Sequence, residues 1–163
     1  MDAKKIKRIK SQIMNRPLIL VTNDDGITAP GIRKLIHIMN GIGDVIVVAP
    51  NSPQSGKGHA ITINSTLSYE ELNLEGPQKD FSCSGTPVDC VKMALDKILP
   101  RRPDLVVSGI NHGANSSINV IYSGTMSAAV EAGVEGLQSI GFSLSDLKWD
   151  ADFDQAEDFI REI

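Results

Sequence analysis

The sequence contains little cysteine, few aromatic residues and no long apolar run. Cys83 and Cys90 are the only cysteines among 163 residues, aromatic residues make up 4%, and no C-x-x-C motif occurs. Two thiols are too few for a disulfide scaffold. We therefore expect reduced thiols in the core of a cytoplasmic protein. No stretch approaches the roughly 18 apolar residues of a membrane span, so we expect no membrane partner.

An overall excess of basic residues is also missing. The net charge of −4 argues against a general nucleic-acid binder. The first 16 residues differ, because they carry six Lys or Arg and one Asp without the apolar core of a secretory signal. We interpret residues 1–16 as a basic N-terminal extension. Residues 17–163 are long enough for one domain with its own core.

Strand-like and helix-like segments alternate along this domain. Short apolar runs predict strands at Leu18–Thr22, Asp44–Ala49, Leu105–Ser108 and Ser139–Ser143. Helical spacing of apolar residues predicts helices at Gly31–Asn40, Thr86–Leu99 and Ser127–Ala132. The second helix opens with a capping threonine, a first-turn proline and Asp89. The alternation predicts an α/β fold: a Rossmann-like, doubly wound, mostly parallel sheet with helices on both faces.

Residues 60–83 interrupt this alternation. Ala60–Ile63 and Thr66–Tyr69 have the composition of short strands, and Asn73–Asp80 that of a polar turn. We therefore expect an inserted β-hairpin.

Two adjacent carboxylates follow the first predicted strand, in Asn23-Asp24-Asp25-Gly26. At ~4 Å and an effective dielectric constant of ~20, two such charges repel each other by about 4 kcal/mol. A bound divalent cation removes that cost, and Mg²⁺-type ions favour carboxylates together with water and phosphate oxygens. A solvated turn in which Asp caps the next helix is the alternative.

Other polar loops follow the neighbouring predicted strands. One contains Ser55 and Gly56, and another contains Asn111 and Asn115. Ligands of open α/β sheets bind beyond the carboxyl ends of the strands, so we expect these loops to meet the Asp pair in an all-oxygen site for a hard cation. Ordinary turn composition is the alternative for each loop taken singly.

A Ser-Gly-Thr turn adds a candidate anion site. Ser123, Gly124 and Thr125 precede a small-residue helix, whose free N–H groups and dipole favour a phosphate. A plain helix cap is the alternative reading. Neither a P-loop nor a dinucleotide-binding fingerprint is present, because Gly58 replaces the required Ser or Thr and Ile46 replaces the last Gly.

Five ordered blocks of the chain resemble the SurE (survival protein E) family of metal-dependent nucleotide phosphatases. They contain Val21–Gly26 with Ala29–Gly31, Val48–Pro50 with Ser55-Gly56, Ser84–Val91, Pro103–Asn111 and Tyr122–Thr125. The resemblance implies a Rossmann-like fold and hydrolysis of nucleoside 5′- and 3′-monophosphates, often with exopolyphosphatase activity. It also implies homodimers or homotetramers of the full-length protein.

The resemblance further implies a single divalent ion, Mg²⁺ or Mn²⁺, held by Asp24, Asp25, Ser55 and Asn111. We expect metal-activated water to attack phosphorus, with Asp24 and Asp25 as the catalytic carboxylates. Substrate binding is assigned to Asn23, Gly56, Asn115, Ser123, Gly124 and Thr125. These residues would hold the phosphate oxygens as charge develops.

The end of the sequence raises an alternative function. Family members usually continue well past Ile163, through a section that builds the oligomer, so the domain is interpreted as truncated at its C-terminus. A non-catalytic nucleotide- or metal-binding domain is therefore the alternative, and a phospho-aspartate phosphotransferase is a rival enzyme class. Phe153, Phe159, Ile160 and Ile163 share helical spacing and predict an apolar stripe. This stripe should pack on the domain or on another subunit, or remain disordered, and we favour a self-association surface.

Overall fold

The computed structural model describes residues 16–148 and 151–163. The predicted basic extension therefore lies outside the described residues, except for Arg16. No helix in the described part of the chain combines the length and apolar character needed to cross a membrane.

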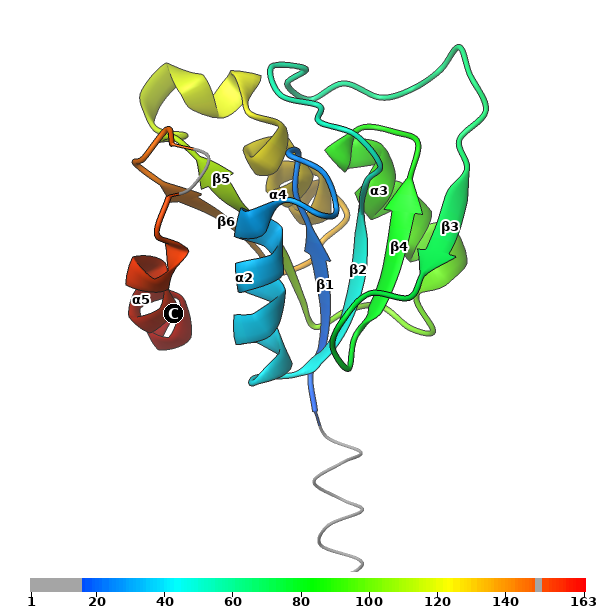
Figure 1. The fold of residues 1–163 in the computed structure, drawn as a ribbon. Helices are drawn as coiled ribbons and strands as arrows, with labels where there is room; N and C mark the ends of the chain where they lie inside the picture. The colour runs from blue at the N-terminus through cyan, green and yellow to red at the C-terminus, as the bar shows by residue number, and fades with distance from the viewer. Residues whose placement is uncertain (1–15, 149–150) are drawn as a thin grey trace, which may run out of the picture.

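A six-stranded sheet forms the centre of the molecule, in the order β3-β4-β2-β1-β5-β6 (Figure 1). Its strands are β1 (Leu18–Thr22), β2 (Asp44–Pro50), β3 (Tyr69–Leu72), β4 (Lys79–Cys83), β5 (Leu105–His112) and β6 (Ser139–Leu144). Only β3 runs antiparallel to its neighbour. The four predicted strands are confirmed, although β5 extends four residues beyond Ser108, past an irregularity in its pairing with β6.

Helices cover both faces of the sheet (Figure 1). The α-helices are α2 (Pro30–Asn40), α3 (Pro87–Met93), α4 (Gly124–Val134) and α5 (Glu157–Glu162). A π-helix, η1 (Ala94–Ile98), continues α3, and two 3₁₀ helices are η2 (Ser117–Tyr122) and η3 (Phe153–Ala156). Helix α2, with η3 and α5 beside it, lies on one face, and α3 and α4 lie on the other. The predicted doubly wound α/β class is confirmed.

Alternating side chains of the central strands form two separate cores. In β1, Ile19 and Val21 pack with α2, whereas Leu18 and Leu20 pack with α3 and α4. Each central strand is therefore apolar on both faces, as expected for a parallel sheet between two helical layers. This explains why the predicted strands read as continuous apolar runs.

Helix α3 begins as its sequence predicted. Thr86 accepts a hydrogen bond from the Asp89 backbone N–H, and the Asp89 carboxylate accepts one from the Thr86 N–H, so the two residues form a capping box. The predicted single helix to Leu99 is wrong in its last turns. There the Leu99 N–H bonds to Ala94 O, five residues back, in a π-helical turn. Leu99 itself is extended and ends the helix, because Pro100 disfavours α geometry in the residue before it.

The inserted hairpin exists, but its strands were placed too early. Tyr69–Leu72 pairs with Lys79–Cys83, and Ala60–Ile63 forms no strand. The backbone N–H and hydroxyl of Thr62 donate to the Asp89 carboxylate instead of to a neighbouring strand. A side-chain acceptor on α3 thus replaces the ladder that strand composition had suggested.

The C-terminal apolar stripe divides between core and solvent. Phe153 and Ile160 are buried against α2 and the sheet, whereas Phe159 and Ile163 are 72% and 80% exposed. The first pair confirms that the segment packs on the domain. The second pair, Phe159 and Ile163, is exposed and could pack against another protein surface.

The order of the strands places a switch point at β1. The chain passes from β1 through α2 to β2 on one side, and from β4 through α3 to β5 on the other. Loops at the carboxyl ends of β1 and β5 therefore separate there, which is where open α/β sheets bind ligands.

Candidate functional site

A cavity of about 300 Å³ lies at this switch point. Residues from the carboxyl ends of β1 and β5, the loop after β2, η2 and the segment after β6 line it. They are Asp24, Asp25, Ser55, Gly56, Asn111, His112, Gly113, Ala114, Asn115, Asn119, Tyr122, Ser123 and Leu147. The predicted convergence of the three polar loops is therefore observed.

Asp24 is fixed between β1 and the first turn of α4. Its side chain accepts a hydrogen bond from the Thr125 hydroxyl, and its backbone carbonyl accepts one from the Gln54 N–H at 2.7 Å. A Cβ atom at Gly124 would lie 2.6 Å from the Asp24 Cβ, so only glycine allows this approach. Burial raises the pKa of Asp24, the Thr125 hydrogen bond opposes this, and the Asp25 charge adds to it.

Asp25 faces the loop after β2. Burial raises the pKa of its carboxyl group, while His112 and a hydrogen bond with Ser55 oppose the rise. Ser55 therefore lies beside Asp25, as a shared cation site requires. The two carboxyl groups lie in surroundings that disfavour negative charge until a cation compensates it.

Asn111 reaches the site from the end of β5. Its amide nitrogen donates to the carbonyls of His112 and Gly113, both at 2.9 Å. The amide oxygen is thereby turned toward α4 and lies 3.4 Å from the Thr125 hydroxyl. The Thr125 hydroxyl thus lies beside both Asp24 and Asn111, at the ends of the neighbouring strands β1 and β5.

These donors fit a hard divalent cation. The four predicted ligands line one cavity and all offer oxygen, the donor type that Mg²⁺ and Mn²⁺ prefer. Within residues 16–148 and 151–163 no three His, Cys, Asp or Glu side chains gather around one point. A cation here would therefore depend on two carboxylates with neutral oxygens, rather than on a zinc-type set.

Helix α4 points its N-terminus at the same cavity. Ser123 caps it by accepting a hydrogen bond from the Met126 N–H, and its side chain lines the cavity. The first turn of a helix carries N–H groups without intrahelical acceptors and the positive end of the dipole. The predicted Ser-Gly-Thr turn is the start of α4, which begins three residues before the predicted helix.

The predicted substrate-binding residues occupy different places. Gly56, Asn115 and Ser123 line the cavity. Gly124 and Thr125 lie behind it and support Asp24. Asn23 is also outside the lining, since its amide nitrogen donates to Gly26 O at 2.9 Å and closes the turn after β1. Substrate contact by these residues stays a prediction.

The lining also includes residues that the sequence did not single out. Asn119 lies on η2, and Leu147 follows β6. The segment after β6 is held over the site because the Gly113 N–H donates to the carbonyls of Leu144 and Asp146. Only the polar composition around η2 could have pointed to Asn119, and no pattern pointed to Leu147.

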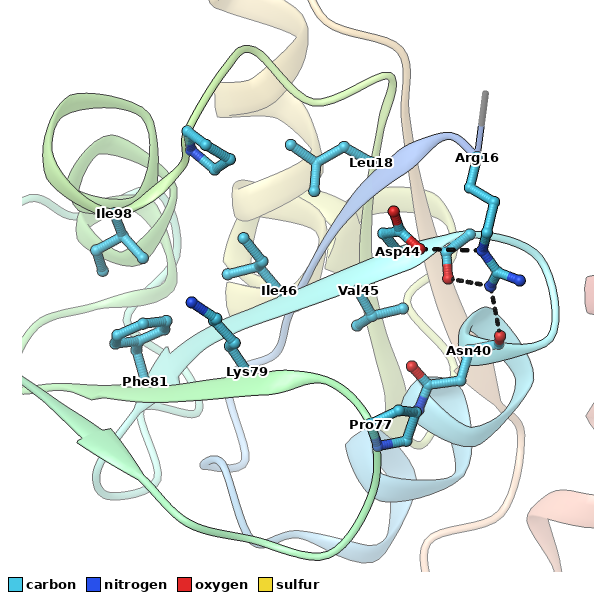
Figure 2. A pocket seen from close by; sticks show the side chains of 12 residues that line it. Arg16, Leu18, Asn40, Asp44, Val45, Ile46, Pro77, Lys79, Phe81 and Ile98 are labelled. Atoms are coloured by element: carbon cyan, nitrogen blue, oxygen red, sulfur yellow. Dashed lines mark hydrogen bonds and ion pairs between the residues drawn. The ribbon is translucent and has the colours of Figure 1, made fainter. Parts of the chain in front are cut away.

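A larger cavity, of about 690 Å³, lies at the opposite edge of the sheet (Figure 2). Leu18, Asp44 and Lys79, at the amino ends of three parallel strands, contribute to its wall. Arg16 pairs with Asp44 at 3.0 Å and donates to backbone carbonyls of Asn40 and Gly43. The other walls of this cavity are largely apolar, and none of the predicted site residues lines it.

Comparison with known proteins gives one consistent result. A family model described as "Survival protein SurE" matches residues 19–163. A 5′-nucleotidase SurE of Flavobacterium johnsoniae is 66% identical over 149 residues, which are 91% of this chain and 58% of that protein. The 5′-nucleotidase SurE of Cytophaga hutchinsonii is 60% identical over 151 residues, or 92% of this chain and 58% of that protein.

A solved structure agrees with these relatives. The SurE protein from Aquifex aeolicus superposes with a TM-score of 0.75 and 35% identity, covering 90% of this chain and 59% of that one. The chain thus spans less than two thirds of the length of each of these proteins. On the matched residues and the shared fold, the chain belongs to the SurE family.

Proposed function

We propose that the chain carries the site of a metal-dependent phosphatase that hydrolyses nucleoside monophosphates. One observation carries the proposal: a buried and a partly buried carboxylate, two neutral oxygen side chains and a helix N-terminus line or adjoin one cavity at the switch point of the sheet. Cation ligands beside an anion-binding helix end suit a phosphate ester. The names of the relatives support a nucleotide as its alcohol portion.

Each residue has a proposed role. Asp24, Asp25, Ser55 and Asn111 would hold one Mg²⁺ or Mn²⁺ ion. When bound, that ion supplies charge withdrawal from the phosphate and acidifies water. Ser123 and the first N–H groups of α4 stabilise the negative charge that develops on the phosphate oxygens.

Asp24 orients the attacking water and accepts its proton. Thr125 and the Gln54 N–H fix this residue at the wall of the cavity. Water forms a new bond to phosphorus and the ester P–O bond breaks. The leaving nucleoside oxygen takes up a proton from solvent, and Asp24 releases the proton that it accepted to solvent. No phosphorylated aspartate is involved, so a trapped phosphoenzyme would favour the phosphotransferase alternative.

The finer parts of the proposal concern substrate, compartment and assembly. We propose activity on 3′- as well as 5′-monophosphates and on short polyphosphate, in the cytoplasm. We also propose that the full-length protein is a homodimer or homotetramer. The exposed Phe159 and Ile163 support an association surface near α5.

Turnover of p-nitrophenyl phosphate tests the proposal. The purified chain should hydrolyse this ester, lose the activity after treatment with a chelator, and regain it when Mn²⁺ or Mg²⁺ is added. Absence of turnover with either metal, together with measurable binding of Mn²⁺, would instead identify a non-catalytic metal-binding domain.

A further inference from the structure

A buried carboxylate on α4 lies outside the site described above. Glu131 is 5% exposed, yet both of its oxygens are paired. Lys92 of α3 lies 2.5 Å from Oε1, and the Nε2 atom of His59 lies 2.7 Å from Oε2. A buried charge is costly unless it is paired in this way.

Glu131 is therefore held in its charged form by two partners of different kinds. Burial would raise the pKa of Glu131, but hydrogen bonds from Lys92 and His59 outweigh it and keep the pKa below its ordinary value. Lys92 connects one helix to another. His59 instead connects α4 to a long segment without regular structure between β2 and β3.

That segment carries the proposed metal ligand Ser55. On its N-terminal side it is attached through the Gln54 N–H, which donates to Asp24 O at 2.7 Å. Ser55, Gly56 and Lys57 are exposed, and Gly56 and Gly58 both have positive φ. The three exposed residues therefore have little burial to hold them, and glycine adds backbone freedom. Gly58, in contrast, is buried.

On its C-terminal side the same stretch is attached at three residues. His59 bonds to Glu131, the next residue, Ala60, accepts a hydrogen bond from the Thr86 hydroxyl at 2.7 Å, and Thr62 donates to the Asp89 carboxylate. His59 is the attachment nearest to Ser55, and it is the one that reaches α4. Gly58 lies against η2, because a Cβ atom there would approach Ile121 O to 3.1 Å. The loop therefore contacts η2, which contributes to the rim of the cavity, at the residue directly before His59.

We propose that His59 is a positioning residue, which through Glu131 ties the loop Ser55–Gly58 to α4 and so holds Ser55 beside Asp25. The consequence for metal binding rests on the function proposed above, whereas the consequence for the loop does not. His59 contacts neither cation nor substrate in this account.

Two matched variants test the clamp. His59→Ala removes the partner of Glu131 that belongs to the loop, and Lys92→Met removes the partner of Glu131 that belongs to α3. Both leave the same buried carboxylate with one partner, so both should lower thermal stability similarly. Only His59→Ala should change the loop.

Trypsin cleavage after Lys57 reports on the loop directly. We expect about tenfold faster cleavage in His59→Ala than in Lys92→Met, because one hydrogen bond to a charged group no longer opposes local opening. His59→Gln keeps a donor and should restore much of the protection. Equal cleavage rates in His59→Ala and Lys92→Met would overturn the proposal.

Calorimetric titration with Mn²⁺ reports on the consequence for Ser55. We expect His59→Ala to weaken binding about tenfold, as loss of a supporting residue behind a metal ligand does, and Lys92→Met to leave it unchanged. Equal Mn²⁺ affinities in the two variants would overturn the role toward Ser55. If the unaltered chain binds no Mn²⁺, the proposed function fails, and the cleavage rates still decide the clamp.

Discussion

Asp24 and Asp25 combine burial with mutual repulsion, and the residues around them explain how the fold tolerates this. Thr125 donates to Asp24, and Ser55 bonds to Asp25. These neutral partners lower the free-energy cost of burying the two negative charges without neutralising them, and burial still raises both pKa values. The remaining cost is the reason to expect a cation.

The four proposed ligands should contribute unequally to cation affinity. Asp25→Asn removes a charge, whereas Ser55→Ala and Asn111→Ala remove neutral oxygens. We expect calorimetric titration with Mn²⁺ to give the larger loss for Asp25→Asn. Equal losses for all three variants would contradict the assignment of Asp25 as a charged ligand.

Gly124 should be intolerant of a methyl group. A Cβ atom at this position would lie 2.6 Å from the Asp24 Cβ, so Gly124→Ala must displace either Asp24 or the start of α4. We expect at least a tenfold loss of Mn²⁺ affinity. Gly133→Ala in the same helix is the control, because its Cβ meets nothing closer than 3.9 Å. The control should raise the free energy of unfolding by about 0.5–1 kcal/mol. Unchanged affinity in Gly124→Ala would show that the close approach is unimportant.

The sequence predicted the meeting of the three polar loops better than the rest of the cavity, for a physical reason. Parallel strands end at one edge, so residues just after β1 and β2 and at the end of β5 must meet. Asn119 and Leu147 belong to segments that fold back over the site, and no strand periodicity describes such a return. The inward position of Asn23 was also hidden, because its side chain closes a turn.

Among the elements, long periodic segments were predicted well and the insertion was not. Strand β1 and helix α2 have buried residues at regular spacing, so their bounds were nearly correct. Residues 60–63 have strand composition, but Asp89 takes the hydrogen bonds of Thr62. A distant side-chain acceptor cannot be read from local composition.

Helix α5 should loosen in acid. Hydrogen bonds from Lys34 and Arg161 lower the pKa of Glu157 to about 2, below its unfolded value of about 4.3. A lowered pKa means that the contribution is complete above the unfolded value and is lost as the pH falls from about 4.3 toward 2. Hydrogen exchange of α5 amides should therefore rise across this range relative to that of β1.

Glu157→Gln provides the control for this prediction. It removes the titrating group, so α5 should already exchange faster at pH 7 and should depend less on acid. The same acid dependence in Glu157→Gln and the unaltered chain would assign the loosening to another group.

At the scale of the whole molecule, the two edges of the sheet differ in character. The polar loops lie at the carboxyl edge, and the amino edge has a larger, mainly apolar cavity whose wall includes Arg16. Volume alone would have favoured the amino edge. Topology and chemistry favour the other, since the switch point and the acidic residues coincide there.

The exposed part of the C-terminal stripe should mediate weak self-association. Phe159 and Ile163 each forgo roughly 1.5–3 kcal/mol of burial in water. We expect dimers that dissociate on dilution, and a monomer for Phe159→Glu, by light scattering across a concentration series. Val134→Glu alters an exposed apolar residue on α4 and should leave the dimer intact. A strict monomer at every concentration would rule the surface out.

Release of inorganic phosphate from adenosine 5′-monophosphate, measured before and after chelation, decides whether the site is a metal-dependent phosphatase. Hydrolysis should stop with the chelator, return with Mn²⁺, and be absent at saturating Mn²⁺ in Asp24→Asn. The variant should remain folded, with apo stability equal or slightly higher, because one of two repelling charges is gone. Unchanged turnover in folded Asp24→Asn, or hydrolysis indifferent to the chelator, would contradict the account.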